Sequence, residues 1–237
     1  IDYDGDGWLD LFVVNSYADA QLGQWLAHGG PPRTALFHND HGRFTDVSRS
    51  SKADLAVRGT GCVAADFDLD GHTDLFVSTA GYDPERDAFD ALLWNDGDGT
   101  FTEGARSAGI NDLGWHAGAT VADVNGDRLP DLFVTGYTDV NAPAPGSIRG
   151  FPTNRLGVPD RLYLNEGPGR NGRSRFREVA KPAGIERNGI RHGLGAMFTD
   201  VNGDGRPDLY VANDEDPNSL YLNVLWPGGA KADPTGL

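Results

Sequence analysis

The sequence predicts an all-β fold made of repeated units of four short antiparallel strands. Three observations support this prediction. Four acidic segments of one pattern recur along the chain of 237 residues. Runs rich in valine, phenylalanine, leucine, tyrosine and threonine, bounded by turn residues, recur with them, as expected of strands. Glycine (33 residues) and proline (14 residues) are spread through the chain, which suits many short strands joined by turns.

Each unit contains up to four recurring pieces, which we name strands A to D. Strand B follows the acidic segment, and the four copies read DYDGDGWLDLFVVN from Asp2, DFDLDGHTDLFVST from Asp66, DVNGDRLPDLFVTG from Asp123 and DVNGDGRPDLYVAN from Asp200. Strand C is expected at 35–39, 91–95, 161–165 and 219–223. Strand D is expected at 43–48, 100–105 and 175–180, and strand A at 61–65, 118–122 and 195–199. The acidic segments therefore form the A–B loops, which we number one to four.

A recurring unit of four antiparallel strands is typical of a β-propeller blade. We expect units at about 1–60, 61–117, 118–194 and 195–226, followed by a tail rich in glycine and proline at 227–237. The first unit lacks strand A and the fourth lacks strand D, which leaves 14 strands. A compact four-bladed domain is one interpretation. Because both ends break inside a blade, and the chain starts without methionine, we favour a processed or partial chain of a larger propeller. Residues 20–28 could form one helical turn.

The A–B loops are candidate metal sites because oxygen ligands stand at positions 1, 3, 5 and 9, usually with glycine at position 6. This spacing lets a tight loop wrap its carboxylates around one point. Oxygen ligands in that number favour Ca²⁺ over transition metals. With the backbone carbonyl of position 7, the candidate ligands are Asp2, Asp4, Asp6, Trp8 and Asp10; Asp66, Asp68, Asp70, His72 and Asp74; Asp123, Asn125, Asp127, Leu129 and Asp131; and Asp200, Asn202, Asp204, Arg206 and Asp208.

Two other interpretations of these loops explain less. An EF-hand needs a glutamate at position 12 and flanking helices, whereas position 12 is always valine and lies inside strand B. Polar turns would account for one such loop, but four clusters of carboxylates without cations would be repulsive. We therefore expect up to four Ca²⁺. Loop three has Arg128 where glycine is expected, which predicts a weaker site or a distorted turn.

The charge balance supports the same idea. The chain has 35 acidic and 20 basic residues, a formal net charge of −15. This charge argues against nucleic acid and against an anionic membrane surface as partners, and no apolar run is long enough to span a bilayer. The loops hold 14 aspartates, so removing them from −15 leaves −1. The acidity is thus concentrated in the proposed metal loops.

The DxDxDGxxDLxV loops, the LYLN strands and the GxF strands resemble FG-GAP/VCBS repeats over almost the whole chain. Residues 192–214 (HGLGAMFTDVNGDGRPDLYVAND) followed by SLYLN are similar to the cartilage-acidic-protein-like branch. The resemblance implies a calcium-binding, seven-bladed propeller, as in integrin α-subunit heads and many exported bacterial proteins, although only four units are present and the C-terminal domain common in that branch is not visible. It also implies export, to the periplasm, cell surface or exterior. The single cysteine, Cys62, allows no internal disulfide.

The unit predicts two functional faces. The A–B and C–D connections share one end of the strands, whereas the long B–C insertions at 16–34, 80–90 and 136–160 and the D–A connectors share the other. Because loops often carry binding function, we expect the second face to bind another protein or a glycan, in a scaffold, an adhesion complex or a larger assembly. The candidate contacts are Tyr17, Trp25, Tyr82, Trp115, His116, Tyr137, Phe151 and His192. Packing of the loops is the alternative role for each of them.

Catalytic signatures such as HExxH, GxSxG or a P-loop are absent from the sequence, so we expect no enzyme. The alternative is a polysaccharide lyase or hydrolase, with carboxylates supplied by Asp83, Glu85, Asp87, Asp90 and Asp139. His116 and His192 precede strand A at matching places and could ligate a metal or act as a base, but a structural role is favoured. Residues 167–172 match GxGxxG without a following helix and are interpreted as a hairpin. Cys62 is expected to be a buried small side chain.

Overall fold

The computed structural model describes residues 1–81 and 89–224. Within them the chain is all-β with a few short helices, as predicted, and its strands form antiparallel sheets. The candidate residues Tyr82, Asp83, Glu85 and Asp87 and the tail at 227–237 lie outside the described residues. None of the described helices is long and apolar enough to cross a bilayer.

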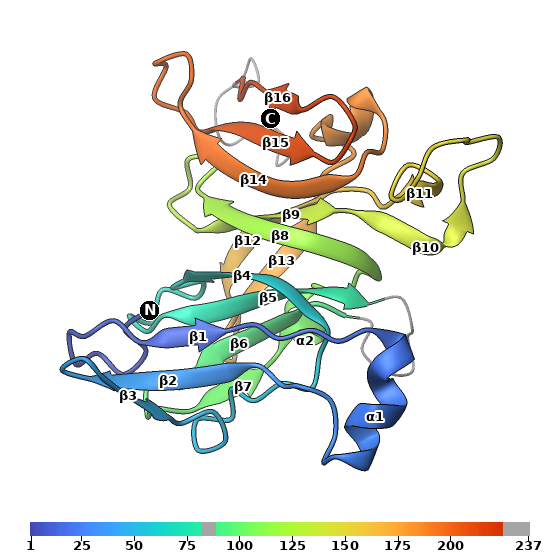
Figure 1. Cartoon of the computed structure of the whole chain (residues 1–237). Helices are drawn as coiled ribbons and strands as arrows, with labels where there is room; N and C mark the ends of the chain where they lie inside the picture. The colour runs from blue at the N-terminus through green and yellow to red at the C-terminus, as the bar shows by residue number, and fades with distance from the viewer. Residues whose placement is uncertain (82–88, 225–237) are drawn as a thin grey trace.

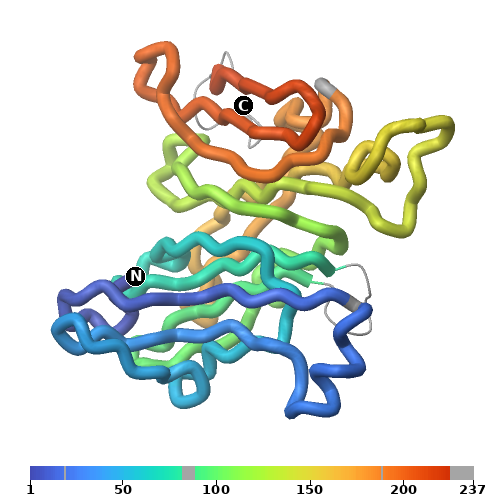
Figure 2. Tube along the Cα trace, viewed as in Figure 1, coloured from blue at the N-terminus to red at the C-terminus, as the bar shows by residue number. Residues whose placement is uncertain are grey.

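The strands of the repeat form four antiparallel ladders, one per unit, which we name sheets one to four; they follow one another along the chain from the bottom to the top of Figure 2. Sheets two and three are joined into one eight-stranded sheet by the pairing of Ala80 with Trp115 and of Gly81 with Gly114. Sheet one contains β1 (Leu11–Val13), β2 (Ala35–Asp40) and β3 (Arg43–Asp46). Sheet two contains β4 (Gly59–Ala65), β5 (Asp74–Gly81), β6 (Ala91–Asn95) and β7 (Phe101–Glu103). Sheet three contains β8 (Gly114–Ala122), β9 (Asp131–Gly136), β12 (Arg161–Pro168) and β13 (Ser174–Glu178). Sheet four contains β14 (Gly193–Thr199), β15 (Asp208–Asn213) and β16 (Ser219–Tyr221).

These sheets contain the 14 strands expected from the repeat, and the insertion at 136–160 adds two more. β10 (Thr138–Pro143) and β11 (Arg155–Gly157) pair as a separate hairpin. A 3₁₀ turn (Asp19–Gln21) and α1 (Leu22–Ala27) occupy the segment expected to hold a helical turn. The short helix α2 (Ala105–Ala108) and a 3₁₀ turn (Ile185–Asn188) follow strand D in the second and third units.

Strand A is longer than predicted in each complete copy because it continues across a bulge. The register shifts between Gly59 and Gly61 in β4, with equivalent shifts in β8 and β14. Neighbouring A strands approach closely at the glycine that follows each bulge, which is Gly61 in β4 and Gly118 in β8. A side chain on Gly61 would lie 3.0 Å from the Ala117 carbonyl oxygen, and one on Gly118 would lie 3.2 Å from that of Leu194. The glycine at the start of the predicted strand A piece therefore permits the close approach of adjacent sheets.

The hydrophobic core lies between successive sheets, and strand alternation divides the side chains between the two interfaces. Leu75 and Leu93 of sheet two pack toward sheet one, whereas Phe76 and Leu92 pack toward sheet three. Phe133 of sheet three packs toward sheet four. All residues of β5 and β9 are buried, so the B strands of the second and third units are covered on both faces.

The outer faces of the first and fourth sheets are apolar and uncovered in the described residues. Leu11 and Phe44 on sheet one are 49% and 50% exposed, and Met197 and Leu220 on sheet four are 53% and 50% exposed. Cys62 is exposed, so the prediction of a buried cysteine was wrong. It lies on the side of β4 that faces the first unit, whose described residues form only β1, β2 and β3 and leave it uncovered.

Candidate metal centres and the opposite face

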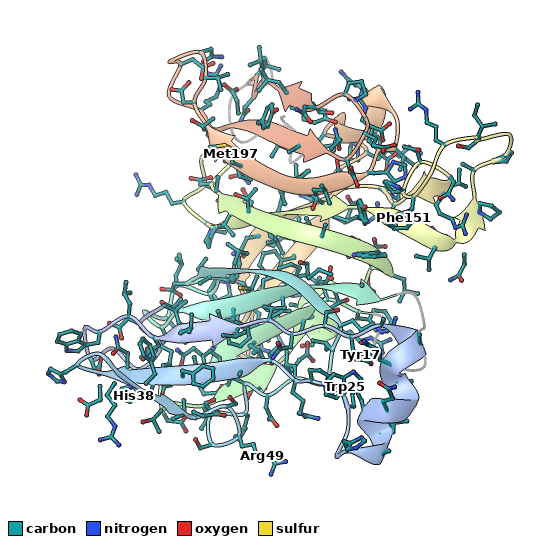
Figure 3. All side chains as sticks on the ribbon, viewed as in Figure 1. Tyr17, Trp25, His38, Arg49, Phe151 and Met197 are labelled. Atoms are coloured by element: carbon teal, nitrogen blue, oxygen red, sulfur yellow. The ribbon has the colours of Figure 1, made fainter. Side chains whose placement is uncertain are left out.

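The four acidic loops lie at one end of the sheets and the insertions at the other. In Figure 1 the A–B loops are on the left, and α1 with the β10–β11 hairpin is on the right. Figure 3 shows the same separation in side chains, with His38 on the left and Tyr17, Trp25 and Phe151 on the right. The unit therefore places the two sets of candidate residues on opposite faces.

The carboxylate at position 1 holds the turn of every loop. Its Oδ2 accepts a hydrogen bond from the backbone N–H of position 6 at 2.8–3.1 Å: Gly7 to Asp2, Gly71 to Asp66, Arg128 to Asp123 and Gly205 to Asp200. Arg128 has a φ of 71°, close to the values of its glycine counterparts. The arginine therefore keeps the common turn of loop three rather than distorting it.

Positions 3 and 5 bring further oxygens beside position 1. Oxygens of Asp2, Asp4 and Asp6 lie within 4.8 Å of one another, and so do those of Asp66, Asp68 and Asp70. In loops three and four the asparagine at position 3 donates to the aspartate at position 5 at 2.9 Å. The residues at position 7 donate their N–H to the same aspartate at 2.8–3.0 Å: Trp8 to Asp6, His72 to Asp70, Leu129 to Asp127 and Arg206 to Asp204.

The carboxylate at position 9 is buried beneath each loop. Each accepts one backbone N–H from position 2 and one from the asparagine at the end of the predicted strand C piece, at 2.7–3.0 Å: Asp10, Asp74, Asp131 and Asp208. Burial raises the pKa of Asp74 and that of Asp131 to about 7, although these hydrogen bonds act in the opposite direction. A cation beside these carboxylates would favour their charged form.

The asparagine that ends strand C was missed as a functional residue by the sequence analysis. Its amide crosses to the preceding unit and donates to the carbonyl of position 2 in that loop. Asn95 donates to Tyr3 at 2.7 Å, Asn165 to Phe67 at 2.7 Å and Asn223 to Val124 at 2.8 Å. The asparagine that recurs at the end of each strand C piece was the signal in the sequence that could have identified this contact. These bonds tie loops one, two and three to the next sheet.

Positive or titratable side chains already contact two loops within their own units. His38, also missed from the sequence, has its Nδ1 at 3.2 Å from both Asp4 and Asp10. The Arg206 side chain pairs with Asp204 in its own loop. His38 with Asp4 and Asp10 forms a third group in which one ligand atom per residue lies close together.

The donor set fits a hard divalent cation. The ligand atoms of loops one and two are carboxylate oxygens held close together by a tight turn, as a hard cation prefers. In loop two, Oδ1 of the buried Asp68 has no hydrogen-bond partner within the described structure. A buried carboxylate oxygen without a partner is costly unless another group, such as a metal ion, satisfies it.

This repeated loop and its strands identify the family. Residues 2–77 and 78–134 each match the FG-GAP-like repeat, and together they make up more than half of the chain. The chain belongs to the FG-GAP-like repeat family. No protein with a curated description matches it. FG-GAP-like repeats are typical of propeller-like modules that bind other proteins, which agrees with the antiparallel four-stranded sheets of the second and third units.

On the opposite face of this FG-GAP-like chain, four of the predicted partner residues form one aromatic cluster. Ring centroids lie 5.1 Å apart for Trp115 and Tyr137, 5.9 Å for Tyr137 and Phe151, and 6.2 Å for Tyr137 and His192. Tyr137 is buried and donates its hydroxyl to Asp214 at 2.8 Å, whereas Phe151 is 52% exposed. Phe151 is therefore the accessible member, and Tyr137 packs beneath it.

The other candidates on this face are dispersed. Trp25 on α1 is 37% exposed, and Tyr17 lies under the guanidinium of Arg58 at 4.9 Å. His116 is 1% exposed and thus inaccessible to a partner. A cavity of about 350 Å³ lies between Trp115, Asp139 and Asn141 beside the β10–β11 hairpin.

His116 and His192 both contact carboxylates. His116 Nδ1 lies 2.8 Å from Asp90 and its Nε2 3.5 Å from Asp112, which also pairs with Arg161. Burial lowers the pKa of His116, but Asp90 and Asp112 outweigh burial and raise it to about 9. His192 Nδ1 lies 2.9 Å from Asp216. The buried, ion-paired environment of His116 is that of a structural residue rather than of a free base.

Proposed function

We propose that this chain is an exported calcium-binding module of the propeller type whose insertion face binds another protein. The observation that supports calcium most strongly is the fourfold repetition of one loop geometry. In every loop the carboxylate at position 1 closes the turn and the carboxylate at position 9 lies buried below. In loops one and two the oxygens at positions 3 and 5 also lie within 4.8 Å of position 1, and in loops three and four the asparagine at position 3 bonds to the aspartate at position 5. In such loops a bound cation would offset repulsion among carboxylates that the turn holds together.

Thermal unfolding tests the calcium proposal. A ligand that binds only the native state raises the melting temperature. We therefore expect the protein to melt at a higher temperature in millimolar Ca²⁺ than in EGTA, by several degrees when the Ca²⁺ concentration is about 100 times the Kd. Asp127→Asn changes an exposed ligand and should lower this Ca²⁺-dependent rise while leaving melting in EGTA nearly unchanged. Identical melting curves for the wild type in Ca²⁺ and EGTA would refute calcium binding.

We further propose that another sheet of the same kind covers each outer face, as in a closed propeller of up to seven blades. Val201, at position 2 of loop four, is 49% exposed, whereas its counterparts Tyr3, Phe67 and Val124 are covered by the following sheet. The isolated chain should then bind a hydrophobic dye or self-associate, and Leu220→Lys with Met197→Lys should reduce either effect. A strict monomer that binds no dye would oppose this proposal.

For the insertion face, Phe151 and Trp25 are the proposed partner contacts because both are large, exposed aromatic side chains. Phe151→Ala and Trp25→Ala should reduce capture of a protein partner at least tenfold with unchanged melting temperature. Leu26→Ala is a matched control, since Leu26 is an exposed apolar residue on the same helix. Equal capture by all variants would exclude these two aromatic residues, and capture of a glycan instead would identify the alternative partner class.

An enzyme acting on polysaccharides is the alternative function. Of its candidate carboxylates, Asp90 is buried against His116, which argues against a role in proton transfer to a substrate. Asp139 lines the cavity beside Trp115. Metal-dependent turnover in a screen of uronic-acid polysaccharides would favour the enzyme over the binding module.

A further inference from the structure

The hairpin that joins β12 and β13 reaches into the neighbouring unit. Its turn is closed by hydrogen bonds from Gly169 N–H to the Arg173 carbonyl at 2.9 Å and from Gly172 N–H to the Gly169 carbonyl at 3.1 Å. This is the segment whose glycines match GxGxxG, and the structure confirms that it is a hairpin. The hairpin extends further than its β6–β7 counterpart, because Asn165 pairs with Phe176 whereas Asn95 pairs with Phe101. It delivers the side chain of Arg173 to loop two.

Arg173 contacts three carboxylates of the second unit. Its Nη1 lies 2.9 Å from Asp68 Oδ2 and 3.3 Å from Asp70 Oδ2, and its Nη2 lies 2.6 Å from Asp96 Oδ1. Nη1 also donates to the Asn95 carbonyl at 3.2 Å, and the guanidinium stacks 5.5 Å from the centre of the Trp94 ring. A cation from sheet three is thus held by two of the proposed metal ligands of loop two.

Loop two nevertheless keeps an oxygen available for a second cation. Oδ1 of Asp68 is buried and has no hydrogen-bond partner in the described residues, although Oδ2 of the same carboxylate is bound to Arg173. The Asp66, Asp68 and Asp70 oxygens lie within 4.8 Å of one another. The guanidinium and a divalent ion would therefore share the same carboxylates, and two cations at such short range repel each other.

We propose that Arg173 is the resident cation of loop two and competes with Ca²⁺ for Asp68 and Asp70. Loop two then fills at a higher Ca²⁺ concentration than loop one, and filling it loosens the contact between sheets two and three. This inference rests on the calcium binding proposed above. It makes loop two a calcium-sensitive junction, whereas loops one and four have titratable or charged partners only from their own units among the described contacts.

The test compares Arg173→Gln with Arg177→Gln in the full 237-residue chain. Arg177 lies in β13 of the same hairpin and pairs with Glu166 at 2.8 Å on the surface, so its replacement makes the same change in charge away from the loops. Melting temperature is measured in EGTA and across a Ca²⁺ titration. In EGTA, Arg173→Gln should melt at a lower temperature than the wild type. Saturating Ca²⁺ should raise its melting temperature by more, and the Ca²⁺ concentration at the midpoint of this additional rise should be at least tenfold lower than in the wild type. Arg177→Gln should leave the rise in melting temperature with Ca²⁺ and its Ca²⁺ midpoint as in the wild type.

Two further variants assign the effect and guard against misfolding. Adding Asp70→Asn to Arg173→Gln should abolish the shift in Ca²⁺ midpoint, because loop two then lacks a ligand. Arg173→Lys keeps one positive charge but lacks the planar guanidinium that contacts several carboxylates at once. Its Ca²⁺ midpoint should lie between those of the wild type and Arg173→Gln. If Arg173→Gln does not fold, the lysine variant decides the question by the direction of its shift.

The possible failures are distinguishable. Equal destabilisation of Arg173→Gln with and without Ca²⁺, at an unchanged midpoint, would show that Arg173 is only a structural link and would overturn the competition. A wild-type chain whose melting does not respond to Ca²⁺ at all would instead refute calcium binding itself, and the competition with it.

Discussion

At the scale of single residues, loops two and three use left-handed backbone conformations without glycine. Leu69 at position 4 of loop two has a φ of 58°, and Arg128 at position 6 of loop three has a φ of 71°. In the other loops glycine occupies these positions. A side chain at positive φ is strained because its Cβ crowds the backbone. The turn is therefore maintained by the hydrogen bonds to position 1 rather than by glycine alone.

Arg128→Gly should stabilise the protein. Removing the left-handed strain outweighs the added entropy of the unfolded chain, so we expect a gain of about 0.5–1 kcal/mol in the free energy of unfolding in EGTA. Urea unfolding measures it. Gly205→Arg, the reverse change at the same position of loop four, should cost a similar amount. Destabilisation by Arg128→Gly would contradict this interpretation of the turn.

At the scale of elements, the cross-unit asparagines couple the C strands of the second, third and fourth units to the loop of the preceding unit. Asn165 donates to the carbonyls of Phe67 and Pro130, at 2.7 and 3.2 Å. Asn39, the equivalent residue of the first unit, donates to Leu9 in its own unit. The two asparagines therefore differ mainly in whether they link neighbouring sheets.

Asn165→Ala should destabilise the chain more than Asn39→Ala. The first change leaves two carbonyls, including the buried one of Phe67, without this donor, which costs about 1–3 kcal/mol for an unsatisfied buried group. We expect the difference between the variants to be at least about 1 kcal/mol in urea unfolding. Equal losses would indicate that the contact between sheets contributes nothing beyond local packing.

The sequence was sufficient for the strand pieces and the order of the sheets, because alternation, turn residues and the repeat are local signals. The position of the carboxylates in the loops followed from the same spacing. Contacts between units could not be inferred, since they depend on which residues the packing of sheets brings together. Arg173 reaching loop two, Asp90 beneath His116 and the exposed Cys62 all belong to this class.

At the scale of the whole molecule, the buried ion pairs of His116 join sheets two and three. Asp90 precedes β6 of sheet two, and His116 lies in β8 of sheet three. The charges of the two carboxylates that contact this imidazole raise its pKa above the ordinary value of 6.5 to about 9. The contribution of protonated His116 to stability is therefore complete below about pH 6.5 and is lost as the pH rises through 9.

Stability in EGTA should thus fall between pH 7 and pH 9, and His116→Gln should flatten that part of the profile. The upper part of this window lies above the pKa of about 7 of Asp74 and Asp131 and the pKa of about 6 of Asp160, so those carboxyl groups contribute change mainly near its lower end. Urea unfolding across the pH range measures the slope. An unchanged slope in His116→Gln would show that another group titrates.

The distribution of charge also belongs to the whole molecule. The loops hold 14 aspartates of a chain whose net charge is −15, and the fold places these loops at one end of the sheets, as Figure 1 shows. Four Ca²⁺ would bring the formal net charge to −7. The fold therefore gathers much of the acidity of the chain on one face, and we propose that this face binds divalent cations.

The most direct test of calcium binding is a crystal structure grown in Ca²⁺, with an anomalous difference map. We predict peaks at the A–B loops, each surrounded by oxygens of positions 1, 3 and 5, and a weaker peak at loop two while Arg173 is present. A map without peaks in any of the four loops, at Ca²⁺ concentrations in the millimolar range of extracellular modules, would contradict the account.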